Sequence, residues 1–353
     1  MSSTKITGSG TCLPEIILAN QSFLDHHFYD AEGVTIPSSN SEIIEKFQAI
    51  TGIEERRYAS KDLSSADLAT QAAETAIEDA KIDRETLDYI IVAHNVGNIK
   101  AASCQVDILP SVAARVKTNL GIKNPRCVAY DLIFGCPGWI EGMIQAHAFI
   151  KAGMAKKCLV IGSETLSRVV DASDRDSMIF ADGAGATIVE ARNEQGGILS
   201  HLSTTFTAEG EADYIYYGTA NQKTSDQTKY IKMQGRKVYE FALSNVPQAM
   251  KDCLELSGVT IDKVKKIFIH QANQKMDEAI VKRFYRLFKT SAPEDVLPMN
   301  IEKYGNSSVA TVPTLYDLVV KTNFKGHTLA PGDVIIFASV GAGMNINAIT
   351  YQV

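Results

Sequence analysis

The stretch "YDLIFGCPGWIEGM", residues 130–143, joins an extended apolar run to a segment of helical period. The turn between them contains Gly135, Pro137 and Gly138. Proline suits the first positions of a helix, and apolar residues recur after it at helical spacing. A strand, a tight turn and a helix in this order are typical of α/β layers. Cys136 lies in the turn itself, which raises the question of whether this thiol is reactive.

The position of Cys136 predicts a nucleophile. The N-terminus of the following helix favours negative charge, so we expect the thiolate to be favoured over that of a free thiol. The alternative is an inert core residue, which is the commoner role of a cysteine. The Gly-Cys-Pro-Gly turn between strand and helix favours the nucleophile.

The rest of the chain repeats the alternation of short apolar runs with helical segments. Four buried strands are predicted in two similar contexts, at 89–95 and 158–164 and then at 267–273 and 334–341. The Gly-rich segments 182–191 and 340–349 close the two parts in a similar way. Two duplicated α/β halves, 1–193 and 194–353, are the simplest account, although such weak self-similarity also arises by chance.

Composition sets broad limits on function. The 353 residues are 45% hydrophobic and 22% charged, and no apolar run reaches the roughly 20 residues that span a bilayer. The N-terminus lacks the plan of a signal peptide, so we expect a cytoplasmic protein without membrane contact. A net charge of −6 argues against nucleic-acid binding. The six cysteines are scattered and without a CxxC pair, which predicts reduced thiols and neither zinc nor disulfides.

Charge is uneven along the chain. Between residues 263 and 289 only Asp277 and Glu278 accompany a run of basic residues: Lys263, Lys265, Lys266, Lys275, Lys282, Arg283, Arg286 and Lys289. This run is either a solvated helix face or a dock for an acidic partner.

Two further polar residues fall at predicted strand ends. His270 lies in "IFIHQAN" and Asn306 in "YGNSSVATVPT". Taken singly, the histidine is more often a core residue and the asparagine a turn or cap residue. Together with Cys136 they form a set in which a thiolate carries an acyl group and neutral donors stabilise an oxyanion or enolate.

These motifs resemble the type III ketoacyl carrier-protein synthases of the thiolase superfamily. "GCPGW" is similar to that family's nucleophile turn, "HQANQKM" to its His-Gln-Ala-Asn motif and "YGNSSVATVP" to its Gly-Asn-Thr-Ser motif. "TGIEERRYA", "DASDRDSMIFADGAGA" and "SVGAGMN" resemble further motifs in the right order, so the resemblance covers nearly the whole chain. It implies a thiolase-like five-layered αβαβα fold and a homodimer.

The resemblance also implies roles. Cys136 would take an acyl group from a thioester, and His270 and Asn306 would hold the second thioester and stabilise its enolate during a Claisen condensation. The backbone N–H groups of Cys136 and Ala342 would form the oxyanion hole. Substrate or acyl carrier protein would contact four further residues: Leu109, Arg175, Asn273 and Lys275. No metal and no cofactor is implied.

Departures from the family pattern indicate a specialised member. Arg175 is present, but the tryptophan with which the family clamps adenine is replaced near Lys46 and Phe47, and the segment 20–51 is longer than usual. We therefore expect a carrier-protein thioester rather than coenzyme A for at least one substrate. An expansion at 97–107 precedes the segment that lines the family's acyl tunnel, which implies an altered acyl pocket.

The segments "YDLIFGCPGW" and "SVGAGMNINA" are similar to the corresponding segments of ketosynthases that join two fatty-acid-derived thioesters into a cyclohexanedione, a precursor of dialkylresorcinols. There a β-ketoacyl thioester supplies the carbanion. Three alternatives stay open: a decarboxylative synthase that starts fatty acids from acyl-CoA and malonyl carrier protein, a thioester-cleaving cysteine hydrolase of papain type, and a non-catalytic subunit of a partner synthase.

Overall fold

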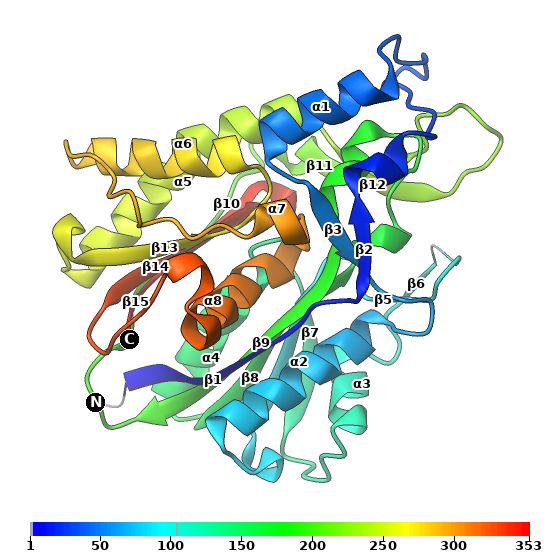
Figure 1. Cartoon of the computed structure of the whole chain (residues 1–353). Helices are drawn as coiled ribbons and strands as arrows, with labels where there is room; N and C mark the ends of the chain where they lie inside the picture. Colours follow the sequence, from blue (N-terminus) through cyan, green and yellow to red (C-terminus); the bar gives the residue numbers. More distant parts are fainter. Residues whose placement is uncertain (1–2, 104) are drawn as a thin grey trace.

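Two stacked β-sheets form the centre of the molecule (Figure 1). This computed structural model describes residues 3–103 and 105–353, so Cys104, one of the cysteines expected to be reduced, lies outside the described residues. The first sheet has the order β1-β9-β8-β4-β7 and the second β10-β15-β14-β13. Their strands are β1 (Ser3–Cys12), β9 (Asp182–Arg192), β8 (Lys157–Thr165), β4 (Tyr89–His94), β7 (Val128–Ile133), β10 (Gly197–Thr205), β15 (Asn345–Gln352), β14 (Val334–Gly341) and β13 (Val264–Ile269).

Helices cover both outer faces and fill the space between the sheets. The outer face of the first sheet carries α2 and α3, the outer face of the second carries α5 and α6, and α4 and α8 lie between the sheets. Their bounds are α2 (Ser65–Ala80), α3 (Val112–Asn119), α4 (Gly138–Lys151), α5 (Gly235–Ser257), α6 (Gln274–Leu287) and α8 (Thr311–Thr322). This order of layers confirms the predicted five-layered αβαβα fold.

The amino-acid sequence explains how deeply α4 is buried and how closely α2 packs against its sheet. α4 is apolar around most of its circumference, as a helix enclosed between two sheets must be, and Trp139 and Met143 are almost fully buried. α2 is rich in alanine and lies very close to β1. An added Cβ at Gly8 or Gly10 would come within 2.5 Å of the α2 backbone, so only glycine allows this approach.

The two sheets repeat one pattern of strand directions. β1, β9, β8 and β4 run antiparallel, antiparallel and parallel in succession, and β10, β15, β14 and β13 do the same. The turn of residues 193–196 lies between β9 and β10. The predicted strand at 334–341 coincides with β14, whereas β13 ends at Ile269, so His270 follows its strand instead of lying within it.

Further helices and strands lie outside these two sheets and six helices. They are α1 (Asn40–Thr51), β2 (Ile16–Ala19), β3 (Glu55–Tyr58), β5 (Asn98–Ile99), β6 (Val106–Asp107), β11 (Ile215–Thr219), β12 (Lys229–Met233) and α7 (Ile301–Tyr304). Within the described part of the chain, no helix has the length and apolar character of a bilayer span.

Candidate active site

The turn that carries Cys136 follows the edge strand of the first sheet and packs against the end of β14 in the second sheet. β7 ends at Ile133, Gly135 takes a positive φ of 71° and Pro137 is the N-cap of α4. An added Cβ at Gly341 would lie 2.6 Å from the Cys136 nitrogen, and one at Gly135 would lie 2.9 Å from the Ala342 nitrogen. The two segments that carry the expected oxyanion-hole N–H groups are therefore in direct contact.

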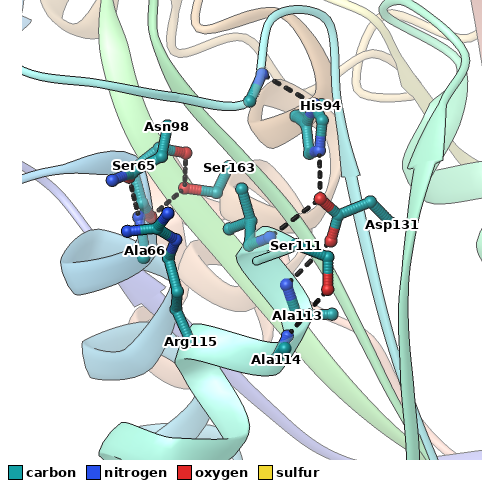
Figure 2. Close-up of polar contacts among 12 residues, drawn as sticks. Ser65, Ala66, His94, Asn98, Ser111, Ala113, Ala114, Arg115, Asp131 and Ser163 are labelled. Atoms are coloured by element: carbon teal, nitrogen blue, oxygen red, sulfur yellow. Dashed lines mark hydrogen bonds and ion pairs between the residues drawn. The ribbon is translucent and has the colours of Figure 1, made fainter. Parts of the chain in front are cut away.

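Asp131 anchors the strand that leads into this turn (Figure 2). Its carboxylate accepts hydrogen bonds from the first turn of α3, at Val112 N (2.8 Å) and Ala113 N (2.7 Å), and contacts His94 Nε2 at 2.9 Å. Burial raises the pKa of Asp131, but the bonds from His94, Ala113 and Val112 outweigh it and lower the pKa. These bonds join β4 and α3 to β7, the strand that leads into the Cys136 turn.

His270 follows β13 and is held by one ring nitrogen. Nδ1 lies 2.8 Å from Thr311 Oγ1, and this hydroxyl donates at 2.9 Å to the Ser308 carbonyl. Because the Thr311 proton is used, these hydrogen bonds assign the proton to Nδ1 and leave a lone pair on Nε2. Burial lowers the pKa of His270 to about 4, so the ring is neutral at pH 7.

Asn306 is fixed by its backbone and its amide oxygen. Asn306 N donates to the Ile179 carbonyl (3.0 Å), its own carbonyl accepts from Ala181 N (2.8 Å), and Oδ1 accepts from Ser308 N (2.8 Å). With Oδ1 occupied, Nδ2 is the atom that can donate to a substrate carbonyl.

Ser308 contacts all three expected catalytic residues or their partners. Its N–H holds Asn306, its carbonyl accepts from the Thr311 hydroxyl beside His270, and its hydroxyl donates to Cys136 Sγ at 3.2 Å. Ser308 has a φ of 52°, in the left-handed region that a serine rarely adopts. Such strain is kept where the surrounding structure enforces it, often at functional sites. The structure therefore brings Cys136, His270 and Asn306 together around one residue.

The expectation that the helix N-terminus favours the Cys136 thiolate is wrong for this resting structure. Burial raises the pKa of Cys136 to about 12, and the Ser308 hydroxyl and the backbone lower it only in part. Cys136 keeps some accessible surface, yet desolvation by the surrounding protein has the largest effect on its pKa. The thiol is therefore protonated at rest.

The other residues expected at the site lie around it in different roles. Asn273 is the N-cap of α6, with its side chain accepting from Met276 N at 3.0 Å. Lys275 is exposed in the first turn of the same helix, and Arg175 is also largely exposed. Leu109 precedes a cis peptide bond to Pro110 and is 85% exposed.

Two members of the expected charged run are not on the surface. Lys266 is buried, and its ammonium contacts the carbonyl and, at 2.9 Å, the carboxylate of Asp295. Asp277 is fully buried, and burial raises its pKa well above the usual range. The exposed run therefore carries one base and one acid fewer than predicted.

Sequence reasoning missed four residues of the site: Ser308, Thr311, Asn95 and Glu164. Asn95 Nδ2 donates to Ser308 Oγ at 2.7 Å, and Glu164 accepts both the backbone and side-chain N–H groups of Asn95. Asn95 and Glu164 both follow or end predicted strands, which was an available signal. Within the part of the chain that the structure covers, no group of three or more His, Cys, Asp or Glu side chains could hold a metal ion.

Fold and site together define a thiolase-like, acyl-transferring condensing enzyme. Residues 130–207 match the family model described as 3-Oxoacyl-[acyl-carrier-protein (ACP)] synthase III, and residues 254–353 match the model of its C-terminal part. The chain is 34% identical to β-ketoacyl-[acyl-carrier-protein] synthase III 1 of Vibrio vulnificus strain YJ016, with 96% of each chain covered. It is 35% identical to the corresponding synthase III of Caldanaerobacter subterraneus subsp. tengcongensis, with 96% of this chain and 94% of the relative covered.

Solved structures agree with these matches. The crystal structure of 3-oxoacyl-[acyl-carrier-protein] synthase III from Aquifex aeolicus VF5 superposes with a TM-score of 0.83 at 30% identity, covering 99% of this chain and all of the other. The chain belongs to the 3-oxoacyl-[acyl-carrier-protein] synthase III family.

Proposed function

We propose that this family member joins two fatty-acid-derived thioesters by a Claisen condensation, with a β-ketoacyl thioester as the second substrate, to give a cyclohexanedione on the way to dialkylresorcinols. The observation that carries the proposal is the arrangement of Cys136, a neutral His270 and Asn306 around Ser308. Cys136 first takes the acyl group. Its sulfur forms a bond to the acyl carbon, the carrier thiolate leaves, and the thiol proton ends on the departing carrier thiol.

The protonation state of His270 favours proton abstraction in the second stage. With its proton on Nδ1, His270 offers Nε2 as an acceptor, and the α-carbon of a β-ketoacyl thioester is acidic enough to lose a proton to such a base. Once protonated, Nε2 donates to the enolate oxygen together with Asn306 Nδ2. The enolate carbon then attacks the acyl carbon, the bond from that carbon to Cys136 Sγ breaks, and the released thiolate takes the proton back from His270. A second, intramolecular condensation closes the ring and expels the carrier thiol.

The decarboxylative reaction is the second candidate, because the curated relatives carry the name of β-ketoacyl carrier-protein synthase III. That reaction loses carbon dioxide instead of a proton. It gains from two donors to the thioester oxygen from the outset; Asn306 Nδ2 is one, but the resting tautomer of His270 offers an acceptor in place of the second. The tautomer therefore favours the β-ketoacyl substrate.

The surroundings of Arg175 support a carrier-protein thioester. Two segments lie on the loop that precedes this arginine: Tyr29 N donates to the Ser173 carbonyl at 2.9 Å, and Asn221 N donates to Asp171. Phe47, near the place of the family's adenine-clamping tryptophan, packs into a small apolar cluster and lies 5.8 Å from the Arg56 guanidinium. The platform that would stack an adenine is thus engaged within the protein.

The exposed bases of α6 are the proposed dock for an acidic carrier protein. Five basic side chains are exposed along this helix and its C-terminal turn: Lys275, Lys282, Arg283, Arg286 and Lys289. α6 begins directly after the His270 segment, so a carrier bound there would lie beside the site entrance.

A homodimer is proposed from the edge of the first sheet. β7 is the edge strand and exposes Val128 (46%) and Ile133 (63%), while Leu109 nearby is 85% exposed. Arg115 donates to the Leu109 and Pro110 carbonyls at 3.1 Å and so holds this segment in place. An exposed apolar edge next to the nucleophile turn suits a second copy of the chain, with Leu109 reaching the partner's acyl pocket.

The decisive experiment offers the purified protein acyl and β-ketoacyl thioesters, on coenzyme A and on carrier protein, and follows intact mass and products. We expect a stable mass increase on Cys136 and then a cyclohexanedione without release of carbon dioxide. Carbon dioxide release with malonyl carrier protein would favour the decarboxylative synthase. Rapid release of free acid would point to a hydrolase.

A further inference from the structure

A chain of hydrogen bonds runs from Glu164 at the end of β8 to the Cys136 sulfur. Glu164 Oε1 accepts from Asn95 N at 2.7 Å and also from Asn95 Nδ2. Asn95 Nδ2 donates to Ser308 Oγ at 2.7 Å, and Ser308 Oγ donates to Cys136 Sγ at 3.2 Å. Glu164 is completely buried, so this chain is shielded from water.

The direction of the bonds in this chain is fixed by Glu164. A carboxylate oxygen facing two N–H groups forces the amide of Asn95 to present Nδ2, and its second hydrogen then points at Ser308 Oγ. The serine oxygen becomes an acceptor on that side, so its own proton is directed at Cys136 Sγ. An amide cannot pass a proton along, which means that the chain aims a donor and does not carry the thiol proton to Glu164.

We propose that Glu164, Asn95 and Ser308 form a donor relay that orients a hydroxyl toward Cys136 and stabilises its thiolate when substrate arrives. The inference rests on the proposed nucleophile and adds three positioning residues to it. The relay would offset part of the desolvation of Cys136. A sulfur atom that is strongly desolvated needs a directed hydrogen-bond donor to become an anion.

The carboxylate of Glu164 has two opposite effects. It aims Asn95, but above about pH 7, where burial lets the carboxyl ionise, its negative charge disfavours a second negative charge on Cys136 because it raises the pKa of that thiol. Its second oxygen, Oε2, is buried without a hydrogen-bond partner among the described residues, so a glutamine amide could occupy this place. Glu164→Gln therefore separates the two effects: it can keep the acceptor for Asn95 and removes the charge.

The test measures the alkylation rate of Cys136 by iodoacetamide from pH 6 to 10, followed on the Cys136 peptide by mass spectrometry. Ser308→Ala keeps the backbone bonds to Asn306 and Thr311 but loses the hydroxyl, and we expect alkylation to slow about tenfold at pH 8 with the profile shifted up by about one pH unit. Asn95→Ala should slow it similarly, and Asn95→Asp more, because an aspartate would accept the serine proton and turn it away from sulfur.

Variants of Glu164 and a neighbouring serine complete the design. Glu164→Leu should slow alkylation as Asn95→Ala does, whereas Glu164→Gln should be as fast as the wild type or faster. Ser307→Ala, which removes a hydroxyl next in the chain that lies near Gly183, should leave the profile unchanged. Thermal melting of each variant separates a lost relay from a lost fold.

An unchanged profile in Ser308→Ala or in well-folded Glu164→Leu would overturn the relay. This result is distinct from failure of the proposed function, because alkylation needs no substrate. If wild-type Cys136 were never acylated by any thioester, the nucleophile would fail. If it were acylated while the Ser308→Ala profile stayed unchanged, the relay alone would fail.

Discussion

Each sheet has a strand that pairs in parallel with its neighbour and leads into a histidine, β4 in the first sheet and β13 in the second, and the two histidines behave differently. His94 ends β4 with both ring nitrogens engaged: Nδ1 accepts from Gly97 N at 2.8 Å, and Nε2 meets Asp131 at 2.9 Å. His270 follows the corresponding strand β13 with Nδ1 bound to Thr311, and Nε2 has no hydrogen-bond partner within the described residues. Similar positions in the repeated topology thus tie His94 into the fold through both ring nitrogens and His270 through Nδ1, and Nε2 of His270 is the atom that the proposed mechanism uses.

The largest expected effect is at Cys136, the proposed nucleophile, because the proposed role of His270 in condensation depends on an acyl group being bound there. Cys136→Ala should abolish covalent loading and lower condensation by roughly a thousandfold or more. Intact-protein mass after incubation with an acyl thioester checks loading, and an unchanged melting temperature shows that the fold survives. Label that still attaches covalently to the variant would assign another nucleophile.

Replacing each of the two histidines by alanine tests the comparison directly. His270→Ala should keep acyl loading but slow condensation about a hundredfold, because one donor to a developing oxyanion is lost. His94→Ala should instead lower the free energy of unfolding by about 2 kcal/mol, because Asp131 loses a buried partner. Full condensation by His270→Ala would remove it from the site, and a fully stable His94→Ala would refute the structural role.

Local sequence patterns predicted an α/β fold and placed Cys136, His270 and Asn306 at strand ends, whereas the five-layer order followed from the family resemblance. Short continuous apolar runs ended at polar residues, and the motif around Cys136 could be read in one stretch. The thiolate prediction failed because it used the local helix field, whereas the pKa of Cys136 is governed by burial that only the assembled layers create. The prediction that Lys266 belongs to an exposed basic run was wrong for the same reason. Its partner Asp295 lies 29 residues further along the chain, and only the folded structure brings the two together.

The relay illustrates a further limit. Asn95 and Glu164 stood at the ends of predicted strands, so their neighbourhood could be guessed, but the left-handed backbone of Ser308 has no signature in "GNSSVA". A serine hydroxyl reaches the sulfur only because that strained conformation is imposed by its surroundings.

Stability should depend on pH through Glu164, which has no counterpart at the end of β14, where Gly341 stands. Burial raises the pKa of Glu164 from its ordinary value to about 7. The folded state therefore holds a proton that the unfolded chain releases above about pH 4, and stability falls as pH rises from there through 7. Glu164→Gln should lose this slope and gain on the order of 2 kcal/mol over the wild type between pH 5 and 8. Urea unfolding at several pH values measures it, and parallel pH profiles of the two proteins would contradict a pKa of Glu164 raised to about 7.

The comparison extends to the helices that follow the two histidine strands, α3 after β4 and α6 after β13, which differ in how their basic side chains are bonded. Arg115 of α3 is bonded to the chain at Asp107, Leu109 and Pro110, whereas Lys275 of α6 is exposed. Lys275→Glu should lower kcat/KM about tenfold for carrier-bound substrates and leave small thioester mimics nearly unaffected, because a basic dock acts through the charge of its partner. Lys156→Glu makes the same charge change just before β8, at the strand end opposite the site, and serves as the control. Raising the salt concentration should shrink the difference between the two variants. An equal loss of kcat/KM on both kinds of substrate would mean that Lys275 supports the active site itself. It would contradict the proposal that α6 binds the carrier protein.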